Sequence, residues 1–278
     1  MENQNECITA PARDWIRRSG DEPGLERLEA FFTGRGYEPH RHDSYAIGIT
    51  LSGVQSFNYR RETRHSLPGH TMVIHPDELH DGEAGTSEGF LYRIAYIEPR
   101  LLQQALGHAP LPFVDGGICA DPRLHATVHA LLSDIALPRS ELERDDQLVN
   151  LAIALQTVSG QDQRRHRGDF RAAQLAREYI DDNLSRIVTL DDLAHISGRD
   201  RWSLSRDFRS FFGTSPYRYL TLRRLDLVKR SILAGGSLAR SSLAAGFADQ
   251  SHMTRQFAKA FGISPARWLK MLGRIDAV

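Results

Sequence analysis

The chain has 278 residues, of which 41% are apolar and 25% are charged, as is ordinary for a folded protein of one or two domains. No apolar run reaches the length of a membrane span, the first ten residues are too polar for a secretory signal, and two cysteines provide neither a disulfide framework nor metal-ligand spacing. These features exclude a membrane protein and a disulfide-rich secreted protein, and they predict a reduced, cytoplasmic protein.

The net charge of zero conceals an uneven distribution along the chain. Residues 1–168 contain 17 Lys and Arg against 24 Asp and Glu, whereas residues 169–278 contain 18 against 11. A basic C-terminal part indicates either a polyanionic partner for that part or an ordinary charged surface. The opposite charges also suggest a hypothesis, in which the acidic part docks on the basic part until an effector releases it.

The first hundred residues have the pattern of a β domain. Short apolar or alternating runs occupy residues 45–51, 54–59, 71–75 and 90–97, and Gly, Pro and Asp residues separate them. Regular short strands of this kind predict a small barrel or sandwich.

Two amphipathic helices are expected next, over residues 121–137 and 141–158, with Asp121 as the N-cap of the first. They could pack on the barrel or form a dimer interface. The polar stretch SGQDQRRHRG at 159–168 is typical of a linker. We therefore predict a domain over 1–160, a linker over 161–170 and a helical domain over 171–278.

A repeat dominates the C-terminal part. The segments LSRDFRSFFGTSP (204–216) and MTRQFAKAFGISP (253–265) share Arg, two Phe, Gly, Ser and Pro at equivalent places. Each is preceded by a short helical segment and a tight turn at Gly198 or Gly246, which is the pattern of a helix-turn-helix motif. The two motifs are predicted over about 190–212 and 238–261, with one connecting helix over 217–234.

The length of the connecting helix suggests why the motif occurs twice. About 18 helical residues span roughly 27 Å, and with the helix ends this separates the two second helices by about 34 Å, one turn of B-DNA. Two motifs on a stiff rod could enter successive major grooves. The side chains predicted to face DNA are Arg201, Trp202, Ser205, Arg206, Arg209, Gln250, Ser251, His252, Thr254, Arg255 and Lys259.

These segments resemble the AraC/XylS family of transcriptional regulators. The resemblance is carried by LAHISGRDRWSLSRDFRSFFGTSPYRYL (193–220), LRRLDLVKRSIL (222–233) and AAGFADQSHMTRQFAKAFGISPARW (244–268). It implies paired motifs that bind double-stranded promoter DNA and recruit RNA polymerase, usually as an activator. It also implies base-reading roles for Trp202, Ser205, Arg206, Gln250, Ser251, Thr254 and Arg255.

Two positions depart from the family pattern, Ser241 in place of a branched apolar residue and Met253 in place of an aromatic residue or leucine. A buried Ser241 hydroxyl without a partner would cost about 1–3 kcal/mol, although it could bond back to a carbonyl of its own helix. We therefore expect the second motif to be the less stable one.

The N-terminal part resembles the cupin-like effector domains of the same family, so the expected fold class is α+β, a cupin-like β-barrel with a helical dimerisation segment and an all-α domain. Six histidines lie between His40 and His80, and His40 and His42 on one strand would point to the same side. Cupin enzymes add a glutamate to such a pair, but that position falls on Ala46 or Ile47 here. A three-histidine site remains geometrically possible.

The favoured prediction is a pocket for a small-molecule effector without a metal or other cofactor. Its expected lining is His40, His42, Tyr45, Gln55, Tyr59, His80 and Tyr92. A second histidine pair, His125 and His129, is assigned to a half-exposed helix face. No catalytic constellation is present in the sequence pattern, so we predict an effector-controlled, DNA-binding regulator that could form a homodimer. The alternative is a metal-dependent cupin enzyme fused to a DNA-binding domain.

Overall fold

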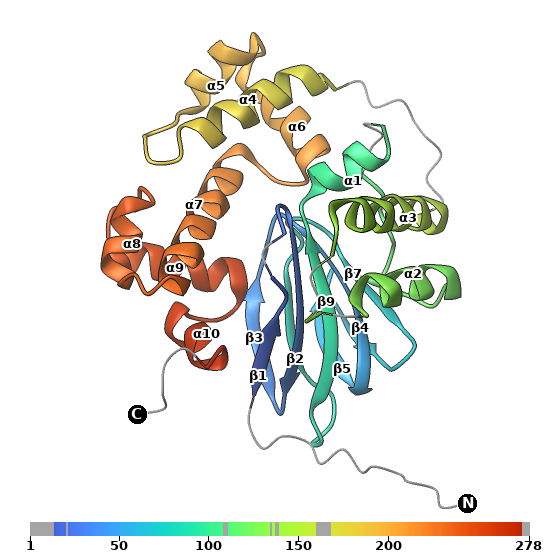
Figure 1. Ribbon diagram of the computed structural model, residues 1–278. Helices are drawn as coiled ribbons and strands as arrows, with labels where there is room; N and C mark the ends of the chain where they lie inside the picture. The colour runs from blue at the N-terminus through green and yellow to red at the C-terminus, as the bar shows by residue number, and fades with distance from the viewer. Residues whose placement is uncertain are drawn as a thin grey trace, which may run out of the picture.

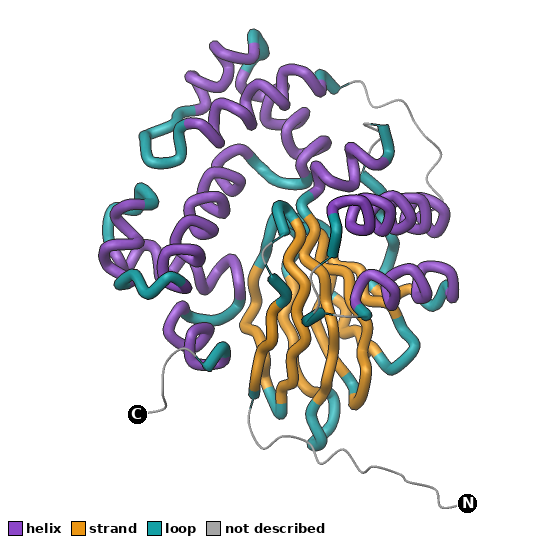
Figure 2. Tube along the Cα trace, viewed as in Figure 1, coloured by secondary structure: helices purple, strands orange, loops and turns teal. Residues whose placement is uncertain are grey.

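Strands build most of the N-terminal part of the molecule, and helices lie on two sides of them and above them (Figures 1 and 2). This arrangement comes from a computed structural model that describes residues 14–20, 22–107, 111–133, 135–136, 139–159 and 168–273. The predicted fold class, a cupin-like strand-rich domain followed by an all-α domain of two helix-turn-helix motifs, is confirmed.

The strands pair in two antiparallel sheets whose order follows from their register. The larger sheet has the order β1 (Trp15–Arg18), β2 (Leu25–Phe32), β9 (Phe90–Ile97), β4 (Tyr45–Gly53), β7 (Thr71–Ile74) and β10 (Ile118–Cys119). The smaller sheet has the order β3 (Arg35–His40), β8 (His80–Ala84), β5 (Gln55–Tyr59) and β6 (Glu62–Ser66).

Large aromatic side chains fill the space between the two sheets, because every second residue of a strand points inward. Phe32, Phe57, Phe90 and Tyr92 are all almost completely buried there. The space left among the inner side chains is a cavity of only about 20 Å³. The interior of the strand-rich domain is therefore a packed core.

Helices cover the opposite face of the larger sheet (Figure 1). The helices on this side are α1 (Pro99–Ala105), α2 (Pro122–Leu132) and α3 (Glu141–Ser159). Asp121 caps α2 as predicted, accepting hydrogen bonds from the amides of Arg123 and Leu124. The helix ends at Ser133, earlier than the apolar spacing predicted.

Seven further helices form the C-terminal part of the described chain. They are α4 (Phe170–Asp182), α5 (Leu190–Ser197), α6 (Arg201–Phe212), α7 (Pro216–Leu233), α8 (Leu238–Ala244), α9 (Gln250–Phe261) and α10 (Pro265–Met271). The connecting helix α7 is continuous, so its 18 residues form a rod of about 27 Å. No helix in the described part of the chain has the length and apolarity that a membrane span requires.

Candidate DNA-binding surface and interdomain site

The first motif consists of α5 and α6. Thr189 and Asp192 form a capping box that starts α5, and Gly198 ends it in the left-handed conformation at φ +65°. Asp200 then caps α6, on which Leu204, Phe208 and Phe212 form the buried stripe. The predicted turn at Gly198 is thus the actual helix end.

The second motif consists of α8 and α9 and repeats this construction. Asp249 caps α9 through a hydrogen bond of 2.6 Å from the amide of His252. Met253 and Phe257 are fully buried, so the unbranched methionine fills the place where the family pattern has another apolar residue.

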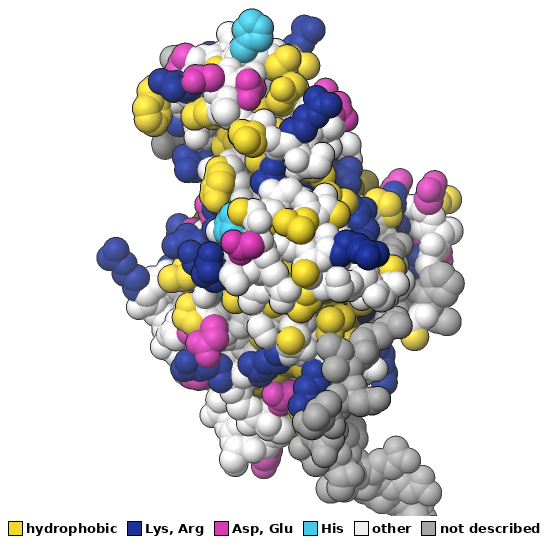
Figure 3. Space-filling model, turned by 90° about the vertical axis from the view of Figure 1, so that its left-hand side faces the viewer, with side chains coloured by type: hydrophobic (Ala, Val, Ile, Leu, Met, Phe, Trp, Pro, Cys, Tyr) yellow, Lys and Arg dark blue, Asp and Glu magenta, His cyan; other side chains and the backbone are white. Residues whose placement is uncertain are grey.

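The side chains predicted to face DNA lie on the outer faces of α6 and α9. Trp202 is 72% exposed, which is unusual for so large an apolar side chain in the absence of a partner. The other exposed members of the set are Arg201, Arg206, Arg209, Gln250, Ser251, Arg255 and Lys259, whereas Ser205, His252 and Thr254 are half-buried. Figure 3 looks at the side of the molecule formed by the C-terminal helices, where Lys and Arg side chains are spread from top to bottom.

The hydroxyl of Ser241 has a partner, which removes the basis for expecting it to loosen the second motif. It lies 2.7 Å from the hydroxyl of Ser231 on α7, so the buried polar group is satisfied by a neighbouring helix rather than by its own. The hydroxyl of Ser242, its neighbour, is buried without a hydrogen-bond partner within the described structure. In α8 the buried hydroxyl that costs stability is therefore that of Ser242, and not that of Ser241.

Both recognition helices end against the strand-rich domain. At Gly213, the C-cap of α6, an added Cβ would lie 2.5 Å from Cβ of Pro76. At Gly262, the C-cap of α9, it would lie 2.8 Å from Nδ1 of His40 and 2.9 Å from the carbonyl oxygen of Glu38. The glycine that repeats in the two motifs thus serves both as a left-handed cap and as a docking point.

Main-chain hydrogen bonds fix the second of these docking points. The amide of Glu38 donates to the carbonyl of Gly262 at 3.0 Å, and the amide of Arg41 donates to the carbonyl of Lys259 at 3.1 Å. The guanidinium of Arg218 on α7 donates in turn to the carbonyl of Arg41 at 2.9 Å. The last turn of α9 is therefore attached to the end of β3 and to the segment that follows it.

Ion pairs between the two domains all have the same polarity in the described structure, with the acid on the N-terminal side. They join Asp14 to Arg267 (3.5 Å), Glu26 to Lys229 (2.8 Å), Asp43 to Arg223 (2.9 Å), Asp77 to Arg218 (2.8 Å) and Glu98 to Arg223 (2.5 Å). This polarity agrees with the uneven charge of the sequence and supports the docking hypothesis.

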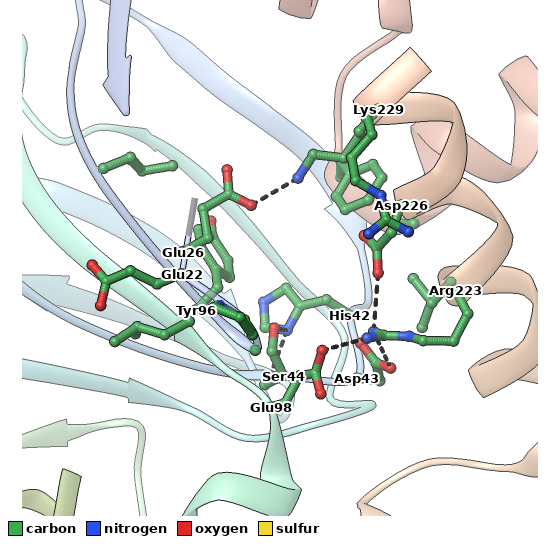
Figure 4. A pocket seen from close by; sticks show the side chains of 18 of the residues that line it. Glu22, Glu26, His42, Asp43, Ser44, Tyr96, Glu98, Arg223, Asp226 and Lys229 are labelled. Atoms are coloured by element: carbon green, nitrogen blue, oxygen red, sulfur yellow. Dashed lines mark hydrogen bonds and ion pairs between the residues drawn. The ribbon is translucent and has the colours of Figure 1, made fainter. Parts of the chain in front are cut away.

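Arg223 forms the most buried of these interdomain ion pairs, the one with Asp43. It contacts Asp43, Glu98 and Asp226, as Figure 4 shows. Burial raises the pKa of Asp43 to about 6 even though Arg223 opposes the shift. Burial alone would lower the pKa of the Arg223 guanidinium, but the surrounding carboxylates raise it well above its ordinary range.

A cavity of about 710 Å³ lies beside these ion pairs, between the two domains (Figure 4). Apolar side chains from both domains contribute to it, among them Leu28 on β2 and Leu222 on α7. Its basic side chains are Arg18, Arg100, Arg177, Arg223, Lys229 and Arg230, and its acidic ones are Glu22, Glu26, Asp43, Glu98, Asp181 and Asp226. The cavity is therefore amphipathic, with balanced formal charge.

At the edge of the cavity Glu26 is paired with Lys229 and Arg18, whereas Arg177 and Arg223 each have one N–H group without a partner among the described residues. Burial alone would raise the pKa of Glu26, but Lys229 and Arg18 outweigh it and lower the pKa to about 2. The Nε atoms of Arg177 and Arg223 are buried without a hydrogen-bond partner among the described residues. An anionic group entering the cavity would find these N–H donors available.

The predicted effector residues do not line one pocket. His40 and His42 line the interdomain cavity, whereas His40, Gln55, His80 and Tyr92 line the small cavity between the sheets. The hydroxyl of Tyr45 donates to the carbonyl of Pro112, and that of Tyr59 lies 2.7 Å from Nδ1 of His75. Neither tyrosine lines either cavity, because each points to another part of the core.

Apart from His40 and His42, the residues that line the interdomain cavity were not predicted from the sequence. Arg223, Asp226 and Lys229 recur at every third position of α7, and charged residues with such a spacing are typical of a solvated helix face. In the structure this charged face points to the strand-rich domain. The opposite net charges of the two parts were the one available signal.

Two family models match the chain, the AraC-like ligand binding domain over residues 22–156 and a helix-turn-helix domain over residues 193–271. An uncharacterized HTH-type transcriptional regulator, YbfI of Bacillus subtilis, is 23% identical over 77% of this chain and 80% of its own length. The HTH-type transcriptional activator RhaS of Yersinia pestis is 24% identical over 86% of this chain and 91% of its own length. The probable transcription factor PqrA of Proteus vulgaris is 33% identical over 29% of this chain and 67% of its own length.

Among solved structures, ToxT from Vibrio cholerae aligns over 95% of this chain and 98% of its own, with a TM-score of 0.63 and 11% identity. The same figures hold for ToxT bound to an unsaturated fatty acid. At this identity the likeness shows a shared fold, including the combination of a strand-rich domain with two helix-turn-helix motifs.

Proposed function

Because this chain belongs to the AraC family of transcriptional regulators, we propose that it binds promoter DNA through both helix-turn-helix motifs under the control of an effector held between its domains. The observation that carries the proposal is the attachment of both recognition helices, at Gly213 and Gly262, to the effector-type domain. A domain that touches both reading helices can change how they meet DNA.

In the proposed complex, α6 and α9 enter successive major grooves on one face of the duplex. The continuous helix α7 supports this arrangement, since it separates the motifs by a rigid element of about 27 Å. Arg206 and Arg255 occupy equivalent exposed positions and are suited to bidentate contacts with guanine. Trp202 and Gln250, at the starts of the two helices, complete the proposed base contacts.

The proposed effector is a small amphipathic molecule with an anionic group, bound in the interdomain cavity. The cavity has a suitable volume and apolar walls, and Arg177 and Arg223 present unpaired N–H donors at its edge within the described structure. A carboxylate there would compete with Glu26 for Lys229 or with Asp43 for Arg223. The fatty acid bound by the structurally similar ToxT supports this chemical class.

Such competition supplies a mechanism for control. The docked state is stabilised by ion pairs between the domains, and an effector that replaces one acidic partner favours the released state by its difference in affinity for the two states. Release frees the end of α9 and lets both motifs align with DNA.

We also propose a homodimer formed through α3. Leu142, Val149 and Ile153 are 81%, 39% and 53% exposed and are spaced by seven and four residues along the helix. This is the spacing of a helix–helix seam, and a second copy of α3 would cover it. Dimerisation would place four reading helices on one promoter.

As the names of its relatives suggest, the chain would act as an activator that contacts RNA polymerase, and it would do so in the cytoplasm where promoter DNA is accessible. Those relatives are named as regulators, and their names give no support to the alternative of a cupin enzyme fused to a DNA-binding domain.

Selection of bound sequences from a random DNA pool by the full-length protein tests the DNA-binding proposal. We expect an asymmetric site with two conserved blocks one helical turn apart. Arg206→Ala and Arg255→Ala should each weaken binding to it by about 1–3 kcal/mol and relax one base preference, while Arg171→Ala, an exposed change on α4, should not relax any. Equal losses on selected and random DNA would contradict a base-reading role.

A further inference from the structure

Three buried histidines meet between the small cavity of the strand-rich domain and the interdomain cavity. His40 ends β3, His80 begins β8 and is its register partner, and His42 follows in the next segment. One potential ligand nitrogen from each lies within 4.8 Å of the others. The ring of His80 is centred 4.2 Å from that of His40 and 4.7 Å from that of His42.

The main chain orients all three rings in the same way. Nδ1 of His40 lies 2.8 Å from the carbonyl of Glu38, Nδ1 of His42 lies 2.8 Å from the carbonyl of Ser44, and Nδ1 of His80 lies 3.0 Å from the carbonyl of Glu78. Because a carbonyl only accepts, each Nδ1 carries the proton and each Nε2 keeps its lone pair. Backbone carbonyls play this orienting role for histidine ligands of metals.

The cluster also has an unused acceptor. His42 is only 4% exposed, and its Nε2 has no hydrogen-bond partner among the described residues. A protonated Nε2 would need an acceptor, and none of the described residues supplies one to His42. A neutral imidazole is the form that binds metals.

We propose that His40, His42 and His80 bind a divalent transition-metal ion, and that the bound ion strengthens the docking of the second motif. Three imidazole nitrogens favour ions such as Zn²⁺, Fe²⁺ or Ni²⁺ over Ca²⁺ and Mg²⁺. Bonds of about 2.0–2.1 Å in tetrahedral geometry bring the nitrogens to roughly 3.4 Å from one another, so the cluster contracts on binding. His40 and His42 also line the interdomain cavity, which leaves an open coordination position available to water or to an anionic effector.

Metal binding would be coupled to docking through Arg41, the residue between two of the proposed ligands. Arg41, flanked by His40 and His42, donates its amide to Lys259 on α9 and accepts from Arg218 on α7. A metal that fixes the two flanking histidines restricts the backbone of Arg41 in the geometry that these interdomain hydrogen bonds require. Gly262 rests against the His40 ring from the other side, so a fixed ring also preserves that contact.

Metal titration of the full-length protein tests the site. We expect one tightly bound Zn²⁺ per chain, and a visible absorption band typical of nitrogen-ligated, low-coordinate Co²⁺ when cobalt replaces zinc. His80→Gln should abolish both, and among the described residues His80 makes no hydrogen bond or ion pair with the C-terminal domain. His75→Gln, a buried change outside the cluster, and His129→Gln, in the pair on α2, should retain both.

Loss of metal in His129→Gln but not in His80→Gln would overturn the assignment of the ligands. Retention of metal by both variants, or no binding by the wild type, would overturn the site itself. A His80→Gln protein that fails to fold would be recognised from its circular dichroism, and His42→Gln would then replace it.

Hydrogen exchange tests the coupling, and this part rests on the docking described under the proposed function. The amides of Glu38 and Arg41 donate across the domain boundary, so their exchange reports undocking directly. Zn²⁺ should slow it by about tenfold in the wild type and not in His80→Gln, with the amides of α2 unaffected. Zinc binding that leaves both amides unchanged would overturn the coupling. Neither readout involves DNA, so a failure here is distinguishable from a failure of the proposed DNA binding.

Discussion

The two helix-turn-helix motifs share a sequence pattern but differ in what they pack against. The first forms its own hydrophobic cluster with α4, around Leu204 and Phe208. The second belongs to the same cluster as the interior of the strand-rich domain, where Phe257 and Trp268 lie on one side and Leu28 on the other. The first motif thus has a hydrophobic core separate from the strand-rich domain, whereas the second motif shares its core with that domain.

The docking points differ in the same sense. Within the described chain, main-chain hydrogen bonds join the second motif to the strand-rich domain, whereas the first motif meets it through the side chain of Pro76 and through α1. Control of DNA binding should therefore act through the second motif. Changes that affect only one motif can test this difference.

The largest effect is expected from Arg223→Met. The substitution leaves Asp43 buried without its cation, whereas Glu98 keeps its ion pair with Arg100. An unpaired buried carboxylate costs about 3–5 kcal/mol unless the domains separate. We expect separation, seen as fast exchange of the Arg41 amide and as tighter DNA binding without effector. Arg240→Met, an exposed change on α8 outside the cavity, is the control. Slow exchange in both variants would show that the ion pairs do not hold the docked state.

A comparison of two glycine caps isolates the docking contact itself. Gly198 and Gly262 both have left-handed backbones, at φ +65° and +69°, so alanine strains either by about 1–2 kcal/mol. At Gly198 nothing lies near the added Cβ, whereas at Gly262 it meets His40 and Glu38. Gly262→Ala should reduce the free energy of unfolding, measured by chemical denaturation, by about 1–3 kcal/mol more than Gly198→Ala does. Equal reductions would mean that His40 and Glu38 move aside at no cost in stability.

Acid should weaken the docking of the second motif through Glu26. Its pKa is lowered from 4.5 to about 2 by Lys229 and Arg18 against the effect of burial, so its contribution is complete above pH 4.5 and is lost as the pH falls toward 2. The carboxylate is one-quarter exposed, so we expect about 1–2 kcal/mol. Lys229→Met should be less stable than wild type by this amount at pH 6 and by much less near pH 2. A constant difference would contradict the ion-pair account.

Two adjacent serines in α8 provide the smallest test. Ser241→Ala removes the partner of Ser231 and should destabilise the second motif by about 1 kcal/mol. Ser242→Ala removes a buried hydroxyl that lacks a partner within the described structure, and should be neutral or stabilising. Thermal melting of the two variants side by side checks the order, and the reverse order would refute the assignment of these hydroxyls.

The sequence was sufficient to predict the C-terminal fold, because each cap and turn there is local. The strands β4, β5, β7 and β9 were also predicted, since each is a short apolar or alternating run bounded by turn residues. The strand β2 was missed because Arg27 and Glu29 interrupt its apolar pattern, and both are buried through ion pairs with Glu22 and Arg93 that only the tertiary structure supplies. The sequence of β8, HDGEA, gave no strand signal because it has no apolar alternation.

The effector site could be predicted only in part. His40 and His42 were identified, but the interdomain cavity also needs residues such as Arg177 and Arg223. These lie more than a hundred positions away in the sequence, on the helices α4 and α7. Tyr45 and Tyr59 were included because they are aromatic residues on strands, a property that does not reveal which side of the sheet each faces.

The account depends on the second motif leaving the strand-rich domain when the protein binds DNA. Spin labels at exposed Ala266 on α10 and Thr63 on β6, with Cys7 and Cys119 replaced by serine, would report that separation, and a label pair at Asp182 and Thr63 would follow the first motif. On binding the selected DNA, the Ala266–Thr63 distance should lengthen and the Asp182–Thr63 distance should change much less. An Ala266–Thr63 distance that is the same in free and DNA-bound protein would contradict the account.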